Sequence, residues 1–555
     1  MTLPSPHSRA HRATVRRILN AYLRENHFHS IAEGPLTVPL PATGGVLHLT
    51  VTYASPTGHH DYAETRPDVI DTLLGELERR TGFAGARVLR AQIDGSINRT
   101  ARYLARAQPP SEPQPPSEPQ PPSEPQPPSE PQPPSEPQPP SQPSLPGSPP
   151  SGPPLSRLRR GTGLDPARDS EQNVLFGHPF HPTPKSAEGF SDADVDAFAP
   201  ELGVSFGLPY LAVARGLARD EGEVTVRDDV AAAVPDGYVP VPVHPWQLRR
   251  LRCNPAVQRL LDNDAVIELG PRGDEVYPTS SVRTVCDPAA GVTWKLPLHV
   301  RITNFVRNTP AEHLRRSADA ARAIARLPAY DGFEVVGETG LRTLDPAVVG
   351  HDLAAEVNAV RRIAPDKRAH VLAGLLDEPT VLAGCAERSG DVAEWLRRYV
   401  TIAQVPLLTA FADHGIAFEA HVQNSLLRLG DDGMPDRFLV RDMEGVAISR
   451  EHAGELPSDS PALHDAGESW LRLCYHAITN QLAHVIHALG RHTAAGERAL
   501  WTVAAAQLER FPAAERLLDL PELPAKTNLL SRFTQRGERP HYVRIPNPLR
   551  KATSR

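Results

Sequence analysis

Two segments near the middle of the chain place hydroxyl groups and positive charges close together. The run 278–284 reads PTSSVRT and sets consecutive hydroxyls beside Arg283. Ser and Thr can donate hydrogen bonds to an oxyanion, and Arg can bind a phosphate or carboxylate through two parallel hydrogen bonds. The run 295–307, KLPLHVRITNFVR, adds Lys295, Arg301 and Arg307. Together these segments predict a site for a polyanionic ligand, although each alone is also compatible with an ordinary surface segment.

A pair of acidic and amide-bearing segments follows further along the chain. The run 419–427 reads EAHVQNSLL, and the run 439–445 reads LVRDMEG. If the two segments form a hairpin, Asn424 lies beside Asp442 and Glu444. Carboxylate and amide oxygens are the ligands that suit Mg²⁺ beside a phosphate, and protein kinases use a comparable Asn and Asp. The Gly-rich loop and VAIK lysine of kinases are absent, as are the Walker A and Rossmann fingerprints. An ordinary polar hairpin remains the alternative.

A proline-rich loop presents two histidines and a lysine. The run 177–190 reads GHPFHPTPKSAEGF and contains His178, His181 and Lys185. Prolines lower the entropic cost of presenting side chains in one arrangement. The histidines could bind zinc, but no cysteine or acidic third ligand is nearby. Alternatively, the histidines and the lysine could hold phosphate oxygens. A structural turn with ordinary hydrogen-bonded histidines is equally compatible with the pattern.

Lysine is rare in this chain. Only five lysines accompany 54 arginines, at positions 185, 295, 367, 526 and 551. Arginine and lysine are not interchangeable, because lysine presents a compact point charge and arginine a planar fork. High genomic G+C content is one explanation of the scarcity. The alternative is that a lysine inside a motif, such as Lys185 or Lys295, has a role that arginine cannot fill.

Periodic patterns identify the elements that must position these groups. Helices are predicted over residues 11–27, 68–80, 392–413 and 467–490. The third should be kinked at Pro406 and end at Gly415. Strands are predicted over residues 46–53, 238–243, 265–269, 292–303, 421–429 and 437–442. Pro297 leaves the register within 292–303 uncertain, because proline cannot donate to a strand ladder.

A proline repeat divides the chain of 555 residues. Of its 60 prolines, 23 fall between residues 108 and 154, where PPSEPQ occurs five times. Such a repeat has no apolar residues to bury and favours extended polyproline II structure. We expect a disordered spacer or surface-loop insertion, with recognition by a proline-binding domain as the alternative.

Composition excludes several classes of protein. The net charge of −7, partly carried by glutamates of the repeat, resembles neither a basic nucleic-acid footprint nor a polybasic membrane patch. No apolar run reaches the roughly 18 residues of a membrane span, and no signal peptide is evident. The four cysteines form no CxxC pair, which argues against a disulfide scaffold or a Cys-type zinc site. We expect a cytoplasmic protein that binds neither nucleic acid nor membrane.

Taken in order, the motifs resemble those of one known family. The series GHPxHPxxKxxxGF, VPVHPWQ, TSSVRT, KLPLHVRITNFVRN, EAHxQN and RDMEG is similar to the siderophore synthetases that work independently of non-ribosomal peptide synthetases, the aerobactin-synthetase-like family. The resemblance implies an α+β fold shaped like a cupped hand, with a palm hairpin distantly like that of kinases. It also implies an N-terminal thumb-like subdomain over 1–107, a linker over 108–155, a fingers subdomain over 156–370 and a palm over 371–555.

The resemblance also implies a reaction. ATP, with Mg²⁺, adenylates a carboxylate of citrate or a related polycarboxylate and releases pyrophosphate. An amine, hydroxylamine or alcohol then displaces AMP, which makes the protein an AMP-forming acid–amine or acid–alcohol ligase. The nucleophile would be a polyamine, an amino acid or a hydroxamate precursor, and a homodimer is the family expectation. The ITNxxR form is more similar to members that use free citrate than to those that use a pre-formed citryl or succinyl monoamide.

Family roles transfer by motif. The implied ATP-binding residues are His178, His181, Lys185, Ser280, Ser281, Arg283, Thr284, Lys295, Thr303, Arg307 and Asn424. The implied substrate-carboxylate residues are Ser281, Arg283, Arg307 and His421. The implied catalytic residues are Arg283, Lys295, Arg307 and His421, and the implied metal ligands are Asn424, Asp442 and Glu444. SAEG follows Lys185 where many relatives have an arginine, so one auxiliary contact is in doubt. A kinase-like phosphotransferase and a non-enzymatic scaffold displaying the proline repeat are the alternatives.

Overall fold

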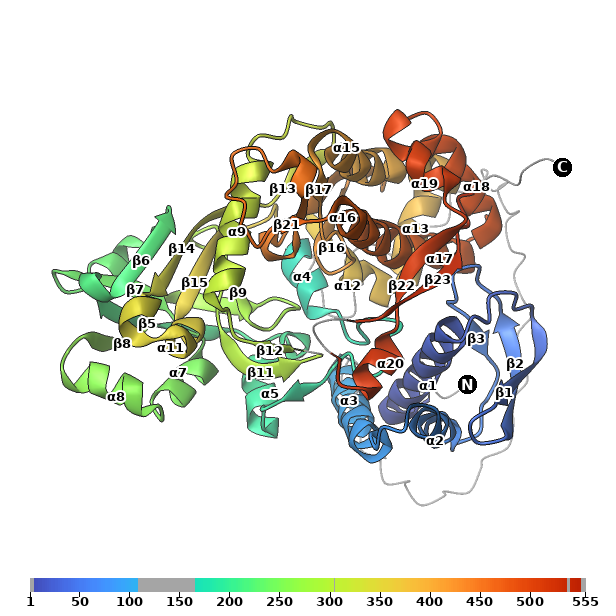
Figure 1. Cartoon of the computed structure of the whole chain (residues 1–555), viewed down its shortest axis with the longest axis horizontal. Coiled ribbons are helices and arrows are strands. Elements are labelled where there is room, and N and C mark those ends of the chain that lie inside the picture. Colours follow the sequence, from blue (N-terminus) through green and yellow to red (C-terminus); the bar gives the residue numbers. More distant parts are fainter. Residues whose placement is uncertain (1–3, 108–164, 304, 537–539, 551–555) are drawn as a thin grey trace, which may run out of the picture.

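The computed structural model describes residues 4–107, 165–303, 305–536 and 540–550. Figure 1 shows a large sheet (green to yellow), a helix-rich region around a smaller sheet (yellow to red) and an N-terminal unit (blue). Helices and mostly antiparallel strands share the chain, so the predicted α+β class is confirmed. The predicted linker, 108–155, lies outside the described residues.

The N-terminal unit packs three helices against a three-stranded antiparallel sheet. Its elements are α1 (Pro6–Glu25), α2 (Val69–Thr81), α3 (Ala86–Ala107), β1 (Gly34–Leu40), β2 (Gly45–Tyr53) and β3 (Asp61–Tyr62). The predicted alternation in β2 buries Leu47, Leu49 and Val51. The C-terminal helix α20 (Asn528–Phe533) docks here, because the Glu25 carboxylate accepts hydrogen bonds from the backbone N–H groups of Leu529 at 2.8 Å and Leu530 at 2.9 Å.

An eight-stranded antiparallel sheet forms the second region. In spatial order its strands are β6 (Ala218–Gly222), β14 (Glu338–Leu344), β15 (Asn358–Ile363), β10 (Val292–Lys295), β9 (Thr284–Asp287), β8 (Val266–Pro278), β5 (Phe206–Ala214) and β7 (Tyr238–Pro242). Strand β10 therefore lies inside the sheet, where Lys295 is opposite Thr284 on one side and Val360 on the other.

The prediction of one strand over 292–303 is wrong. The chain leaves the large sheet after Lys295 and enters a second sheet of β4 (Ala187–Glu188), β11 (Leu298–Ile302) and β12 (Phe305–Arg307). The break falls at Leu296 and Pro297, since proline has no N–H for a central ladder. The apolar residues Val292 and Trp294 of β10 and Leu298 and Val300 of β11 are nevertheless all buried.

A four-stranded sheet lies in the helix-rich region. Its order is β13 (Phe333–Val335), β19 (Pro435–Val440), β18 (Ser425–Leu429) and β16 (Ala369–Val371). Strands β18 and β19 form the predicted antiparallel hairpin, with Ser425 opposite Val440. The first strand of the hairpin begins at Ser425 rather than at residue 421. This sheet takes strands from both sides of the expected boundary at 370, so residues 333–335 pack with the C-terminal part.

Two long helical patterns contain π-helical turns. The predicted helix over 392–413 consists of α14 (Val392–Tyr399), a π turn (Val400–Gln404) and α15 (Val405–His414). Gly415 ends it with φ of +65°, as predicted. The predicted helix over 467–490 likewise consists of α16 (Ala466–Leu473), a π segment (Cys474–Leu482) and α17 (Ala483–His492).

The remaining elements connect and cover these sheets. The helices are α4 (Pro166–Gln172), α5 (Asp192–Phe198), α6 (Asp228–Ala231), α7 (Pro245–Leu251), α8 (Pro255–Asp262), α9 (Ala311–Ile324), α10 (Pro346–Val349), α11 (His351–Glu356), α12 (Leu372–Asp377), α13 (Pro379–Arg388), α18 (Glu497–Leu508) and α19 (Glu515–Asp519). The strands are β17 (Ile416–Ala417), β20 (Ala447–Ser449), β21 (Leu463–His464), β22 (Glu522–Lys526) and β23 (Tyr542–Pro546). Within the described ranges, no helix has both the length and the apolar character needed to cross a bilayer.

Candidate active site

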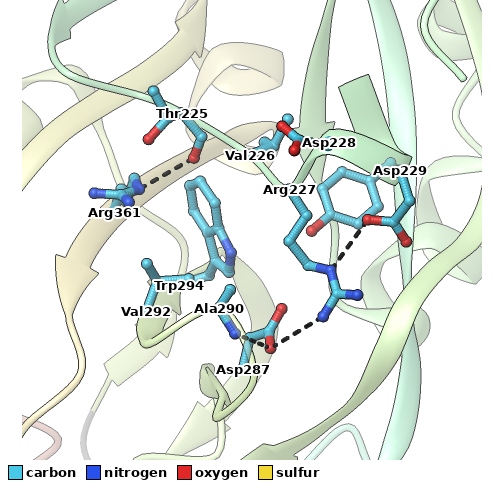
Figure 2. A pocket seen from close by; sticks show the side chains of 11 residues that line it. Thr225, Val226, Arg227, Asp228, Asp229, Asp287, Ala290, Val292, Trp294 and Arg361 are labelled. Atoms are coloured by element: carbon cyan, nitrogen blue, oxygen red, sulfur yellow. Dashed lines mark hydrogen bonds and ion pairs between the residues drawn. The ribbon is translucent and has the colours of Figure 1, made fainter. Parts of the chain in front are cut away.

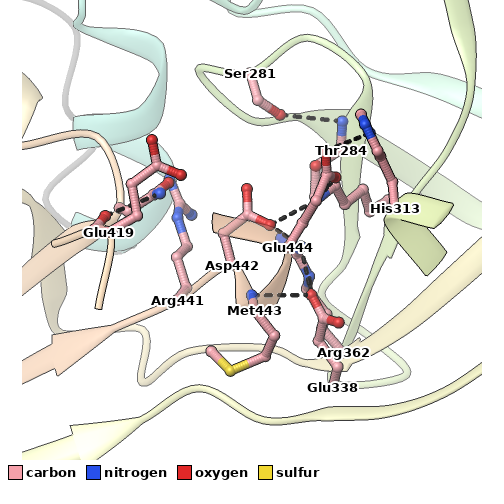
Figure 3. Close-up of polar contacts among 12 residues, drawn as sticks. Ser281, Thr284, His313, Glu338, Arg362, Glu419, Arg441, Asp442, Met443 and Glu444 are labelled. Carbon is pink, nitrogen blue, oxygen red and sulfur yellow. Dashed lines mark hydrogen bonds and ion pairs between the residues drawn. The ribbon is translucent and has the colours of Figure 1, made fainter. Parts of the chain in front are cut away.

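Charged side chains from the two larger sheets meet where these sheets approach each other. Lys295 ends β10, and its Nζ lies 2.5 Å from Asp442 Oδ1 and 2.6 Å from Glu444 Oε2. Both acids follow β19, where the chain turns into a short 3₁₀ helix. Figure 3 shows Asp442 and Glu444 side by side at this meeting point. We call the group of Arg283, Lys295, Arg362, Asp442 and Glu444 the junction.

The cations of the junction keep its acids ionised. Arg283 Nη2 lies 3.3 Å from Glu444 Oε2, and His313 Nδ1 of α9 lies 2.9 Å from Glu444 Oε1. Burial by itself would raise the pKa of Asp442, but Lys295 and Arg362 outweigh it and hold that pKa well below its usual range. Burial would likewise raise the pKa of Glu444. The charges of Lys295 and Arg283 outweigh burial, so the pKa of Glu444 also lies below its usual value.

Arg362 was not among the predicted site residues. It lies in β15, beside β10, and its Nη2 lies 2.8 Å from Asp442 Oδ1 and 2.7 Å from Glu338 Oε1. Burial would lower its pKa, but Asp442 and Glu338 raise it above the ordinary value. No motif in the sequence marks this residue, because its place depends on the strand order of the sheet.

Close to the junction lies the guanidinium of Arg307, which pairs with no acidic side chain among the described residues. Its Nη2 donates to the Ile302 carbonyl and the Thr303 hydroxyl, each at 3.2 Å. Its Nε is shielded from solvent and has no hydrogen-bond partner among the described residues. Burial, followed by the nearby Arg283, lowers the pKa of Arg307 to about 10. Orphaned buried donors are rare, so this guanidinium is suited to an anion.

Backbone strain collects in the same segments. Val282, Thr303 and Asp442 have φ values of +67°, +57° and +77°. Val and Thr, which are branched at Cβ, rarely occupy this left-handed region, and even Asp, which tolerates it better, is uncommon there. Strained backbone persists where the surrounding structure fixes it, and such positions cluster at functional sites. These three residues belong to the TSSVRT, ITN and RDMEG motifs.

Hydrogen bonds to Glu171 and within the loop fix the hydroxyl loop 279–284. The Ser280 N–H donates to Glu171 Oε2 at 2.9 Å, and Glu171 also forms an ion pair with Arg441. The Ser281 hydroxyl lies 3.1 Å from the Thr279 hydroxyl and accepts a hydrogen bond from Thr284 N–H at 3.2 Å. The loop thus reaches the site as a preformed turn.

The segment before β18 presents His421, Asn424 and Glu419. His421 Nδ1 accepts backbone N–H bonds from Gln423 at 3.2 Å and Asn424 at 3.3 Å. Burial lowers the pKa of His421, so the ring is neutral and carries its proton on Nε2. A Cβ built on Gly445 would lie 1.8 Å from Glu419 Oε2, so only glycine leaves room for that carboxylate.

A second set of cations approaches Glu419 from the helix-rich side. Lys526 Nζ lies 4.7 Å from the centre of the Tyr475 ring, and Arg472 Nη2 donates to the Gly445 carbonyl at 3.3 Å. Burial lowers the pKa of Lys526 although Glu419 raises it. The Nζ of Lys526 makes no hydrogen bond or ion pair within the described part of the chain. Its only sequence signal was the scarcity of lysine.

The predicted histidine loop makes mainly structural contacts. Arg17 of α1 donates to the carbonyls of Phe176 at 2.9 Å and His178 at 3.0 Å. His178 Nε2 lies 3.0 Å from Asn480 Nδ2 in the π segment. His181 is buried. Lys185 Nζ lies 2.6 Å from Glu201 Oε1, and both side chains are buried, so this lysine is paired away from the junction.

Two protein-family models match different parts of the chain. Residues 166–377 match the model of the IucA / IucC family. Residues 393–541 match a model described as ferric iron reductase FhuF-like transporter.

Two curated relatives and one solved structure are similar over most of their length. The chain is 37% identical over 429 residues to L-2,3-diaminopropanoate–citrate ligase of Staphylococcus aureus, covering 68% of this chain and 74% of that protein. It is 27% identical to spermidine-citrate ligase of Bacillus anthracis, over 69% of this chain and 73% of the relative. The structure of ATP-bound aerobactin synthetase IucA from Klebsiella pneumoniae has the same fold, with a TM-score of 0.78 at 21% identity over 97% and 99% of the two chains.

The motif order, the α+β fold and the 37% identity to a citrate ligase agree with one another. The chain therefore belongs to the IucA/IucC family of siderophore synthetases.

Proposed function

We propose that this protein is an ATP-dependent ligase that joins a carboxylate of citrate, or of a related polycarboxylate, to an amine during siderophore synthesis. A carboxylate oxygen of the acid attacks the α-phosphorus of ATP, and pyrophosphate leaves. The amine then attacks the acyl carbon, AMP leaves, and the nitrogen loses a proton. The names of the relatives, diaminopropanoate–citrate ligase and spermidine-citrate ligase, support this substrate pair.

The observation that carries the proposal is the half-buried Arg307 guanidinium, whose Nε has no partner among the described residues. It lies near Arg283, whose Nη1 is 3.5 Å from the Arg307 carbonyl, and Arg283 and Lys295 both contact Glu444. Four charges of ATP and three of citrate repel one another strongly. A preformed array of cations stabilises the negative charge that develops on the phosphoryl oxygens without reorganising during the reaction. Arg283, Lys295 and Arg307 are the residues to which we assign this catalytic role.

Nucleotide and acid would occupy neighbouring parts of the site. We assign the ATP phosphates to Lys295, Thr303, Arg307 and the 280–284 loop with Ser280, Ser281, Arg283 and Thr284. We assign the substrate carboxylates to Ser281, Arg283, Arg307 and the Nε2–H of His421, and add Arg472 and Lys526 on the helix-rich side. A neutral His421 donates this hydrogen bond at neutral pH without adding charge. We assign His178, which contacts Asn480, and His181 to the edge of the nucleotide site. Lys185 pairs with Glu201, so we assign it a structural role.

The donor set of the site suits Mg²⁺. Lys295 and Arg362 both contact Oδ1 of Asp442, which leaves Oδ2 without a partner among the described residues. Asn424 donates its Nδ2 to the Glu419 carbonyl at 3.2 Å. Its Oδ1 likewise has no partner among these residues. One or two carboxylates with phosphate and water complete the usual magnesium shell. Asp442 and Asn424, with Glu419 nearby, would hold the ion. Bound there, Mg²⁺ neutralises phosphate charge. Glu444 contacts Lys295, Arg283 and His313, so it fits better as the anchor of these cations than as the predicted ligand.

Several finer expectations extend this proposal. The nucleophile is an amine of the amino-acid or polyamine class, and the acyl donor is free citrate rather than a pre-formed monoamide. The N-terminal unit corresponds to a thumb, the region of the eight-stranded sheet to fingers and the helix-rich region to a kinase-like palm. We further expect the protein to be a cytoplasmic homodimer in which residues 108–155 serve as a spacer.

The decisive experiment supplies the protein with ATP, Mg²⁺, citrate and a panel of amines that includes L-2,3-diaminopropanoate and spermidine. The expected products are AMP, pyrophosphate and a citryl amide, identified by mass spectrometry. Release of ADP and a phosphorylated acid would favour the phosphotransferase instead. Absence of any ATP-dependent product across the panel would favour a scaffold role.

A further inference from the structure

A pocket of about 530 Å³ lies in the region of the eight-stranded sheet (Figure 2). Strand β10 separates it from the junction, because successive residues of a strand face opposite sides. Val292 and Trp294 line the pocket, whereas Lys295 reaches Asp442. The segment 225–229, which precedes and begins α6, forms the facing wall. A cavity of this volume accommodates a small organic molecule.

Two deeply buried side chains present unused polar groups to this pocket. Trp294 is 2% exposed and Tyr210 is 3% exposed, and both line the cavity. Neither the indole N–H nor the phenol hydroxyl makes a hydrogen bond to any residue that the structure describes. By contrast, the buried Tyr399 hydroxyl donates to Gln481 at 3.0 Å. Both polar groups open onto the pocket rather than into the protein interior, so a bound ligand can reach them and supply the partner that the described residues do not.

The charges of the pocket are mixed and separated. Figure 2 shows Arg361 beside Thr225, with Asp287 and Arg227 on the other side of Trp294. Among the residues that the structure describes, the Arg361 guanidinium donates only to neutral groups, the Thr225 carbonyl at 3.1 Å and the Thr339 hydroxyl at 2.8 Å. The lining therefore offers an uncompensated cation at one end and carboxylates at the other.

The acidic end carries more charge than its arginine neutralises. Asp287 Oδ1 accepts the backbone N–H groups of Ala289 at 3.1 Å and Ala290 at 2.9 Å, and lies 3.9 Å from Arg227 Nη1. Arg227 itself is engaged by Asp229 at 3.1 Å and Asp274 at 2.8 Å. The pocket lining holds three aspartates, Asp228, Asp229 and Asp287, and two arginines, which leaves one excess negative charge.

We propose that this pocket binds a free diamino acid, a molecule with one carboxylate and two ammonium groups. The indole N–H is only a donor, so it requires an acceptor that a simple polyamine lacks. The aspartates require positive donors that a simple carboxylate lacks. A diamino acid satisfies both and carries the single net positive charge that the lining leaves uncompensated. The ligand lies across β10 from the reacting groups, so this binding does not rest on the proposed function.

Titration calorimetry on the full-length protein tests the proposal with L-ornithine as the probe. Putrescine, which lacks the carboxylate, and pentanoate, which lacks the ammonium groups, serve as fragments. The expected result is saturable binding of one L-ornithine per chain, with each fragment at least about tenfold weaker. Absence of saturable L-ornithine binding, or putrescine binding as tightly as L-ornithine, would overturn the proposal.

Variants then locate the bound ligand. Asp287→Asn removes the charge and keeps an oxygen for Ala289 and Ala290, and Tyr210→Phe removes only the hydroxyl. Each should weaken L-ornithine binding by about fivefold or more. Trp501→Phe is the control, because Trp501 is a buried aromatic residue that lies outside the pocket and its indole N–H has no partner among the described residues.

The junction is a competing location for an amino acid, so Arg283→Lys is titrated in parallel. Melting temperatures confirm that each variant is folded, and Tyr210→Phe remains informative if Asp287→Asn unfolds. Loss of affinity in Arg283→Lys with wild-type affinity in both pocket variants would place the ligand at the junction and refute the proposal. Citryl amide formation is measured separately, so failure of the pocket and failure of the ligase assignment are distinguishable.

Discussion

Removing the amine of Lys295 is the sharpest single test of the junction. The side chain is 2% exposed and contacts both Asp442 and Glu444. Lys295→Met keeps the length of the side chain and removes its charge. Breaking a buried ion pair costs about 3–5 kcal/mol. Because the two carboxylates keep partial solvent access and the contacts to Arg283 and Arg362, we expect the low end, about 3 kcal/mol.

The loss of stability should depend on pH in a defined direction. In the wild type, Lys295 helps to depress the pKa of both acids, so its stabilising effect is complete above their unfolded pKa values of about 4 and declines as the pH falls below them. In the variant, that depression is reduced. The difference in unfolding free energy should therefore be largest near pH 7 and shrink below about pH 4.

Two assays read the variant out. Urea unfolding at pH 7 and at about pH 3 gives the stability difference on both sides of the unfolded pKa, and citrate-dependent pyrophosphate release gives the rate. We expect adenylation to slow by at least about tenfold, or about 1.4 kcal/mol of transition-state stabilisation. Lys367→Met, at an exposed lysine, is the control and should behave like wild type. Wild-type stability at pH 7 together with a wild-type rate would show that Lys295 neither anchors the acids nor serves the reaction.

Three further predictions test neighbouring features. Asp442→Asn should fold but need more Mg²⁺ and adenylate more slowly, measured as rate against Mg²⁺ concentration beside melting temperature; a destabilised variant with an unchanged magnesium curve contradicts the assignment. Arg307→Lys should slow pyrophosphate release about tenfold, since lysine lacks the planar fork, whereas Arg301→Lys should change it little; equal rates would remove Arg307 from the site. Replacing residues 109–150 with a short Gly/Ser linker should leave that rate within about twofold, because such a repeat cannot pack into a core; a tenfold loss in a folded variant would end the spacer hypothesis.

Local patterns were sufficient for the parts of the site that lie within single segments. The TSSVRT hydroxyls, Lys295, Arg307 and the acids after β19 were all predicted from short motifs, and the β18–β19 hairpin followed from alternation. The motifs could be found because a turn, a strand end or a hairpin brings their residues together within a few positions.

The sequence did not predict the site residues whose position depends on pairing between distant strands. Arg362 lies 80 positions before Asp442, and it reaches that carboxylate only because β15 pairs with β10 in the large sheet. Lys526 stood out only by residue type, since its strand pairs with β23 near the C-terminus. The strand break after Lys295 was missed for a related reason. Alternation continued through Pro297, and only the sheet partners show that the chain changes sheets there.

The π segment Cys474–Leu482 has a consequence for comparing this chain with its relatives. An i→i+5 turn accommodates one more residue than an α turn, so the helix face shifts by about 100° wherever one is gained or lost. Asn480, whose Oδ1 accepts the Val422 N–H at 3.2 Å, and Gln481, whose amide donates to the Ala420 carbonyl at 2.9 Å, hold the segment that carries His421. A relative with a regular α-helix here has one residue fewer in this turn. Its residues equivalent to Asn480 and Gln481 align with them only if the alignment contains a one-residue gap. Equivalent positions beyond Cys474 are therefore assigned reliably by superposing structures rather than by counting along the sequence.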